Sequence, residues 1–330
     1  MSRLVRVELR RLFARRFVLA LMLGSLAVPV LLLVSAWQSV QPPTPAAVAE
    51  AERFYAEAVA MWEADGEEML AQCEADEEAE RARSGADVDF GCEFMGPPQR
   101  SDFLFSAPPF HEVMQTSLLS LTPLAGFLGV LVGATATAAE FSTGSMGTWL
   151  TFEPRRMRVY ASKVLAPGLG VVPVAVVILA LALLGSWVIY GTQDLAGGTL
   201  AHHWRDAAWT GARLVVLAGG AAVVGAALGF LLRHVAAVLG VVIAYGVVAE
   251  GLGRGLLPQV QPYLVLVNVT AWAADGTTYY VEECTTTSLG MTCDYTDQVL
   301  TLAQSAGYLA ALTVLLVGAG AFLFHRRDVT

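Results

Sequence analysis

Six apolar segments, each about as long as a bilayer is thick, separate the polar parts of this 330-residue chain. A helix of about 20 apolar residues crosses the hydrocarbon core of a membrane, whereas helices of soluble proteins average about 11–12 residues. Only 15% of the residues are charged, against about 25% in soluble domains. The sequence therefore predicts an all-α, polytopic membrane protein with six transmembrane helices. The predicted spans are 17–37, 118–139, 164–189, 214–232, 235–257 and 305–324.

Residues 1–16 carry six arginines, and their apolar residues recur at helical spacing. This pattern predicts an N-terminal amphipathic interfacial helix on the cytoplasmic side. The alternative is the start of a signal peptide, with cleavage near residues 45–49. The apolar segment 17–37 is longer than the 7–15 residues of a signal-peptide core, so the sequence favours a retained first span.

The charges predict which polar segments face the cytoplasm. Of the 20 lysines and arginines, 13 lie in four segments, which the positive-inside rule places in the cytoplasm together with both termini. These segments are 1–16, a loop at 140–163, a turn at 233–234 and a tail at 325–330. The other polar segments are then extracellular: 38–117, 190–213 and 258–304. Segment 38–117 is acidic, which is most often simply a solvated face.

All four cysteines fall in the segments assigned to the outside. An even number of cysteines in an oxidising compartment indicates structural disulfides. The simplest pairing is Cys73–Cys92 and Cys284–Cys293. Four cysteines allow three connectivities, and a pairing across the two segments would clamp them into one disulfide-stabilised extracellular cap. Neither pair has the short spacing of a zinc site.

Motifs for catalysis are missing. The sequence has no glycine-rich phosphate loop, so we do not expect the chain to hydrolyse nucleotide by itself. It has no Gly-x-Ser-x-Gly nucleophile motif. His202 and His203 could bind a metal, but an exposed histidine pair beside an interfacial Trp204 is the favoured interpretation. We predict no catalytic residue, no metal site, no cofactor on this chain and no nucleic-acid partner.

Glu250 and Arg254 are the ionisable residues within a predicted span. They are four residues apart, so on an α-helix they could neutralise each other as an intramembrane pair. The sequence leaves open whether such a pair is structural, at the outer interface, or lines a substrate path.

The loop between the second and third spans carries the most informative residues. It begins Glu140-Phe141-Ser-Thr-Gly144-Ser145-Met-Gly147-Thr148 and continues through Pro154-Arg155-Arg156-Met-Arg158 to Lys163. With the basic N-terminal helix, the six spans and the tail Arg326-Arg327-Asp328, this pattern resembles the membrane subunit of type-2 ABC exporters (the type V exporter fold). The resemblance covers the chain except its two large outer segments.

The resemblance implies a transmembrane permease subunit that moves an amphiphilic substrate (lipid-like, peptide or drug-like) outward across a bacterial plasma membrane. ATP and Mg would be bound by a separate ABC ATP-binding subunit, present in two copies. A second permease chain, identical or related, would complete a dimer within the membrane lipid. The loop would form a short helix, capped by Ser142 or Thr143, that inserts into the ATPase. The implied coupling residues are Glu140, Phe141, Thr143, Gly144, Met146, Trp149, Pro154, Arg155 and Arg156.

A second function is compatible with the same sequence. A membrane-anchored signalling or scaffold protein could use the acidic outer segment to bind a ligand or partner, and it also would need no phosphate loop.

Overall fold

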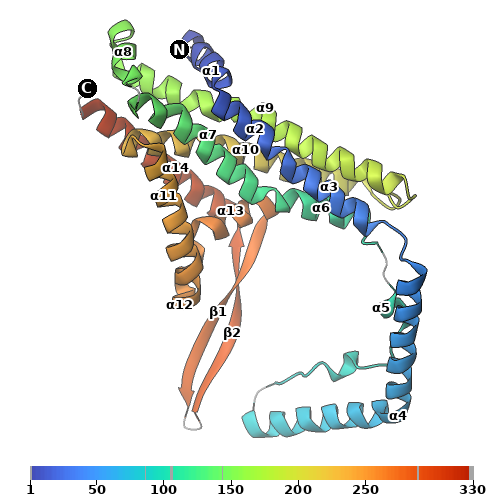
Figure 1. Ribbon diagram of the computed structural model, residues 1–330. Coiled ribbons are helices and arrows are strands. Elements are labelled where there is room, and N and C mark those ends of the chain that lie inside the picture. The colour runs from blue at the N-terminus through green and yellow to red at the C-terminus, as the bar shows by residue number, and fades with distance from the viewer. Residues whose placement is uncertain (1, 86, 105–106, 143, 288–289, 327–330) are drawn as a thin grey trace. The chain divides into compact units, whose positions relative to one another are not determined.

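The computed structural model describes residues 2–85, 87–104, 107–142, 144–287 and 290–326 (Figure 1). The chain forms two compact units. The first, here called the bundle, comprises Met1–Trp37 and Pro109–Thr330. The second, here called the inserted unit, is Gln38–Pro108. Each is described separately.

The described residues contain six helices that are long and apolar enough to cross a membrane, which identifies the chain as a membrane protein by length and composition. Some are built from two consecutive helical segments. They are α2 (Arg16–Ser25) with α3 (Ala27–Ser39), α6 (Phe110–Ser120) with α7 (Thr122–Ser142), α9 (Arg156–Gly191), α10 (Ala201–Leu232), α11 (Val235–Tyr245) with the π-helix η2 (Gly246–Gly253), and α14 (Leu302–Arg326). The six predicted spans are thus confirmed as helices.

Several of these helices extend beyond the predicted spans. Helix α9 begins at Arg156, eight residues ahead of the predicted start of the third span, and α10 begins at Ala201. Hydropathy marks only the apolar part of a helix, whereas the helical hydrogen bonds continue into polar sequence. Residues 156–163, predicted to belong to a loop, are therefore the first turns of α9.

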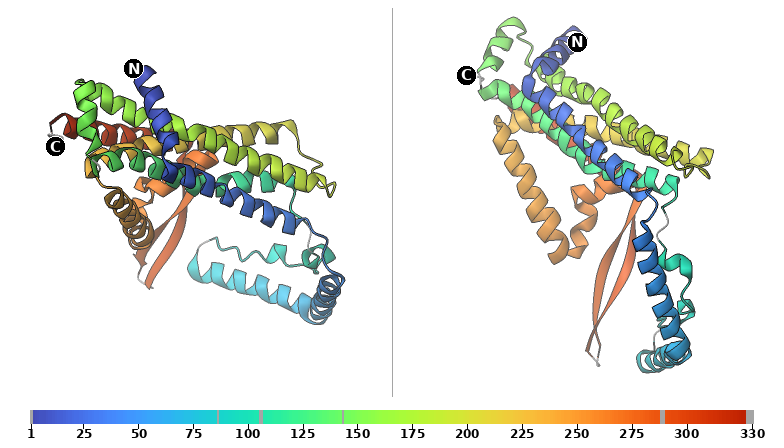
Figure 2. Two further views of the ribbon diagram at one scale, coloured as in Figure 1. Left: turned by 45° about the horizontal axis from the view of Figure 1, so that its top comes forward. Right: turned by 45° about the vertical axis from the view of Figure 1, so that its right-hand side comes forward.

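Helices α7, α9 and α10 lie side by side and form the centre of the bundle (Figures 1 and 2). A Cβ atom added at Gly133 of α7 or at Gly225 of α10 would overlap backbone atoms of the other helix. Thr137 donates a hydrogen bond to the Ala226 carbonyl at 3.1 Å. Small residues thus let the two backbones approach closely, as in other membrane helix pairs. Gly225 and Gly229 of α10 therefore pack against α7 of the same chain.

Segment 258–304 departs from the all-α prediction. It contains a 3₁₀ helix η3 (Pro258–Tyr263), α13 (Val265–Ala274) and an antiparallel hairpin of β1 (Gly276–Thr287) and β2 (Gly290–Thr301). The strands pair from Gly276 opposite Thr301 to Thr287 opposite Gly290. They are rich in threonine, tyrosine and valine, which fit a pleated surface better than a helix. The prediction of an all-α fold is therefore wrong for this segment.

The base of the hairpin packs on the bundle through a small apolar core of Leu264, Val267, Ala271 and Leu300. Trp272 of α13 donates to the Arg213 carbonyl of α10 at 2.9 Å, and Arg213 pairs with Asp275 at 2.9 Å. These contacts fix α13 against α10.

The inserted unit consists of one long helix and a chain that returns along it. Helix α4 (Pro45–Ser84) is capped at its N-terminus by Thr44, whose hydroxyl accepts from the Ala47 N–H, and at its C-terminus by Gly85, where φ is 66°. That positive φ suits glycine. The returning chain contains the short helices η1 (Cys92–Phe94) and α5 (Arg100–Phe103).

Several contacts hold the returning chain on α4, among them a disulfide, an ion pair and a contact between aromatic rings. The predicted disulfide Cys73–Cys92 is confirmed, with Cα atoms 5.9 Å apart. Arg100 donates from Nε to Glu52 at 2.8 Å, and this carboxylate raises the pKa of Arg100. The rings of Tyr55 and Phe103 lie 5.7 Å apart.

The second predicted disulfide falls on side chains outside the described part of the structure. The strand register places Cys284 and Cys293 directly opposite each other in the hairpin. The pairing Cys284–Cys293 therefore stays a prediction.

Candidate functional site

Each of the six spans has one of its two ends at the same end of the bundle. Arg15, at the junction of α1 (Ser2–Ala14) and α2, binds Glu140 near the end of α7. Arg156, at the start of α9, donates to the carbonyl oxygens of Phe324 and His325 in α14 at 3.5 and 3.4 Å. Figure 1 shows α1, α8 (Ser145–Phe152) and the last turns of α14 at this end. We call it the α8 end.

A group of charged side chains, the ionic cluster, lies inside the α8 end. It consists of Glu8, Arg11, Arg15, Glu140 and Lys163. Glu140 and Lys163 are each only 2% exposed. Lys163 Nζ lies 3.0 Å from Glu8 Oε1 and also binds Glu140 Oε2. Glu140 Oε1 lies 2.6 Å from Arg15 Nη2 and 3.5 Å from Arg11 Nη1.

Burying these charges is tolerable only because each has partners. Removing a carboxylate or ammonium group from water costs several kcal/mol unless opposite charges and hydrogen bonds replace the solvent. Glu140 is bound by Arg15 and Lys163 together. Arg15 also donates to the carbonyls of Thr135 and Ala136 at 2.8 and 3.1 Å. The cluster therefore joins the N-terminal helix, α7 and α9 into one unit.

Trp149 connects α8 to this cluster. The Arg11 guanidinium lies 5.2 Å from the centre of its ring and Lys163 Nζ lies 5.1 Å from it. Cations at this distance from an indole face are attracted to it, most strongly when they are partly desolvated. Met146, on the preceding turn of α8, is buried. One side of α8 is thus fixed to α1 and α9.

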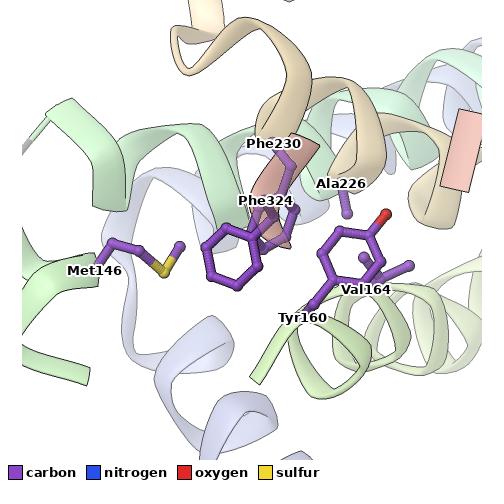
Figure 3. Packing of buried hydrophobic residues seen from close by; sticks show 6 residues of the cluster. All are labelled: Met146, Tyr160, Val164, Ala226, Phe230 and Phe324. Carbon is purple, nitrogen blue, oxygen red and sulfur yellow. The ribbon is translucent and has the colours of Figure 1, made fainter. Parts of the chain in front are cut away.

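A cluster rich in aromatic side chains, the aromatic cluster, also lies at the α8 end (Figure 3). The ring of Phe230 lies 4.6 Å from that of Tyr160 and 4.9 Å from that of Phe324, and Met146 points toward the same group. The Tyr160 hydroxyl donates to the Val317 carbonyl of α14 at 2.7 Å. Phe141 contacts Phe230 edge-on at 5.5 Å. The cluster ties α8 to α9, α10 and α14.

The residues predicted for ATPase coupling divide into two groups. Glu140 and Met146 are buried, and Phe141 and Trp149 face the two clusters, so these four anchor α8. Gly144, Pro154 and Arg155 are exposed, and Arg156 binds the end of α14. Thr143 lies outside the described residues.

The predicted cap of α8 differs in the structure. The residue before the helix is Gly144, with φ 69° and no side-chain cap. Ser142 instead donates to the Ala139 carbonyl at 3.0 Å. The prediction of Ser142 as the cap is therefore wrong, because α7 continues through this residue.

Sequence reasoning missed the partners of Glu140. It assigned Glu8, Arg11 and Arg15 only to an interfacial helix and Lys163 to a basic loop. Two signals were present: Glu8 is the only acid among six arginines, and Lys163 is the only lysine in the chain. A single carboxylate in a basic helix indicates a specific partner.

Glu250 and Arg254 do not form the predicted pair. Glu250 lies in the π-helix η2, and Arg254 directly follows that helix. Glu250 Oε1 accepts from the Leu266 N–H at 2.6 Å. Within the described residues no ion pair joins Glu250 to Arg254. Arg254 instead lines a pocket of about 440 Å³ with Gln261 and Tyr280.

Histidines meet at the opposite end of the bundle. His111 stacks on His203 at 4.3 Å between ring centres, and His202 lies 4.0 Å from His203. His203 Nδ1 accepts from the Leu200 N–H at 3.1 Å. The described part of the chain holds no group of three His, Cys, Asp or Glu residues arranged to hold a metal ion.

Comparison of the chain with protein-family models, curated proteins and solved structures finds no match.

Proposed function

We propose that this chain is the membrane permease subunit of an ATP-driven exporter and that α8 transmits the motion of a separate ABC ATP-binding subunit. The observation that supports this is the two-sided character of α8. Its inner side, with Met146 and Trp149, is fixed to the aromatic and ionic clusters. Its outer end presents Phe152, which is 81% exposed, beside the exposed Pro154 and Arg155.

An exposed phenylalanine on a short helix suits insertion into an apolar groove of a partner protein. Displacement of α8 would then act on α1, α7 and α9 through the ionic cluster and on α10 and α14 through the aromatic cluster. In this proposal Glu140 does not touch the ATPase, because its carboxylate is buried. It holds the helices to which α8 is attached.

We further propose that the α8 end faces the cytoplasm of a bacterial cell, with both termini inside and the inserted unit and hairpin outside. ATP and Mg are bound by two copies of the ATPase subunit. A second permease chain completes the transporter, and the substrate is amphiphilic.

The test is co-purification from cells that express this chain with an ABC ATP-binding subunit of the same organism. We expect the intact chain to retain the ATPase in mild detergent and Phe152→Asp to lose it. The matched control is Phe94→Asp, because Phe94 of the inserted unit is equally exposed, at 83%. Equal ATPase recovery with Phe152→Asp and the intact chain would contradict the coupling role of α8.

A signalling or scaffold protein is the second candidate. It is favoured by the inserted unit, which is compact by itself, disulfide-bonded and rich in acids. In that case no ATPase would co-purify, and replacing residues of the inserted unit rather than of α8 would abolish function.

A further inference from the structure

A groove of about 610 Å³ opens beside the ionic cluster. Arg11, Arg15 and Arg16 line one part of it, and Phe17, Val18 and Val235 line another. Glu140 is the only acidic residue among its lining residues. The groove therefore combines a strongly cationic part with an apolar part.

The arginines of the groove are not fully used by the protein. Arg15 is occupied by Glu140 and two carbonyl groups. Arg11 Nη1 lies 3.5 and 3.6 Å from its carboxylate neighbours and makes no hydrogen bond. Within the described part of the chain, exposed Arg16 makes neither a hydrogen bond nor an ion pair. The exposed guanidinium of Arg16 is thus available to an anion, and the Arg11 side chain, which is 37% exposed, adds a second positive charge beside it.

The position of the groove favours a lipid over a soluble anion. Arg16 is the first residue of the span Arg16–Ser39, so the arginines lie where a membrane helix begins. Phe17, the next residue, is 60% exposed and offers an apolar contact beside the charges. Guanidinium groups bind phosphate through paired N–H donors, and basic pockets between membrane helices bind anionic headgroups.

We propose that this groove binds a phospholipid with an anionic headgroup, its phosphate held by Arg11 and Arg16 and its acyl chain leaving along Phe17. With the orientation given under the proposed function, this lipid belongs to the inner leaflet. The binding itself does not depend on that orientation, and the assay below contains no ATPase. Failure of lipid binding and failure of the transporter proposal are therefore distinguishable.

The test is native mass spectrometry of the purified full chain titrated with phosphatidylglycerol or with neutral phosphatidylcholine. We expect retained phosphatidylglycerol and little phosphatidylcholine. The double variant Arg11→Gln/Arg16→Gln is expected to weaken phosphatidylglycerol binding by at least about tenfold, from the loss of two charged hydrogen-bonding groups. Arg16→Gln alone, on an exposed residue, is expected to weaken it less and without loss of folding.

The control is Arg10→Gln, which removes the same charge from an exposed position of α1 that does not line the groove. Its binding should stay within about twofold of the intact chain, since a phosphate held in the groove does not touch it. An equal loss with Arg10→Gln, or equal retention of both lipids, would overturn the proposal.

A second variant separates lipid from free phosphate. Phe17→Ser should weaken phosphatidylglycerol binding and leave competition by inorganic phosphate unchanged. If Phe17→Ser has no effect and millimolar inorganic phosphate displaces the lipid completely, the groove is a phosphate site and the lipid proposal is wrong.

Discussion

Helices α7 and α10 differ sharply from α11, although all three belong to apolar spans. Of the apolar part of the spans that contain α7 and α10, 50% and 44% is buried within the chain. Only 6% is buried in the span formed by α11 and η2. The glycines show the same contrast. A Cβ atom at Gly133 or Gly225 would meet the neighbouring backbone, but one at Gly240 of α11 would meet nothing within 4 Å.

The contrast shows that hydropathy and packing are separate properties of a membrane helix. Lipid tails are as apolar as leucine, so an apolar surface can face lipid or protein at similar cost. Small residues in register and buried ion pairs identify the spans that pack together. Here α7 and α9 have both, α10 has the small residues, and α11 has neither among the described contacts. Four substitutions test this difference.

Glu140→Ala should have the largest effect. It leaves the buried Lys163 with Glu8 as its only carboxylate partner and deprives Arg15 of its ion pair. Breaking a buried ion pair from one side costs about 3–5 kcal/mol, and we expect the free energy of unfolding in detergent to fall by about that amount. Glu153→Ala, at the half-buried end of α8, should change it by less than about 0.5 kcal/mol. Equal effects would show that the cluster does not hold the bundle.

Gly133→Ala comes next. The added methyl group would overlap the backbone around Ala222, and overpacking of this kind costs about 1–3 kcal/mol. Gly126→Ala is the matched control on the same helix, because nothing lies within 4 Å of its Cβ position. Alanine favours a helix by up to about 1 kcal/mol over glycine, so the control should be neutral or stabilising. The unfolding temperature should therefore fall for Gly133→Ala and stay the same or rise for Gly126→Ala.

The sequence predicted the number, order and approximate position of the spans, because their length and hydropathy are local properties. It also predicted Cys73–Cys92. It could not predict the partners of Glu140, since Arg15 and Lys163 meet it only after three distant segments assemble. The hairpin at 276–301 was missed for a different reason. Its β-branched and aromatic residues favour strands, but its threonines and acidic residues also give it the polarity of an outer loop.

Glu250 shows the same limit of sequence spacing. A separation of four residues brings Glu250 and Arg254 to one face of a helix, but Glu250 accepts a hydrogen bond from the Leu266 N–H instead. Leu266 belongs to the separate helix α13, so this partner, like those of Glu140, depends on how distant segments pack and not on local spacing.

Tyr160→Phe is expected to have a smaller effect than either earlier substitution. It removes the hydrogen bond to the Val317 carbonyl and keeps the ring contacts with Phe230 and Phe324. A hydrogen bond of this kind contributes about 1 kcal/mol. Tyr263→Phe, on a side chain that is mostly exposed, is the control and should leave unfolding unchanged. No difference between the two variants would mean that α14 is held by ring packing alone.

Gly240→Ala should destabilise least of the four, because the new methyl group enters open space on α11 and alanine favours a helix by up to about 1 kcal/mol over glycine. The measurement is thermal unfolding at two protein concentrations, with Gly133→Ala in parallel. If Gly240→Ala is neutral or stabilising at both, α11 faces lipid or detergent. If it destabilises only at the higher concentration, the glycine packs on a second copy of the chain. A destabilisation as large as that of Gly133→Ala at both concentrations would contradict the distinction between the two helices, because α11 would then be packed within the single chain.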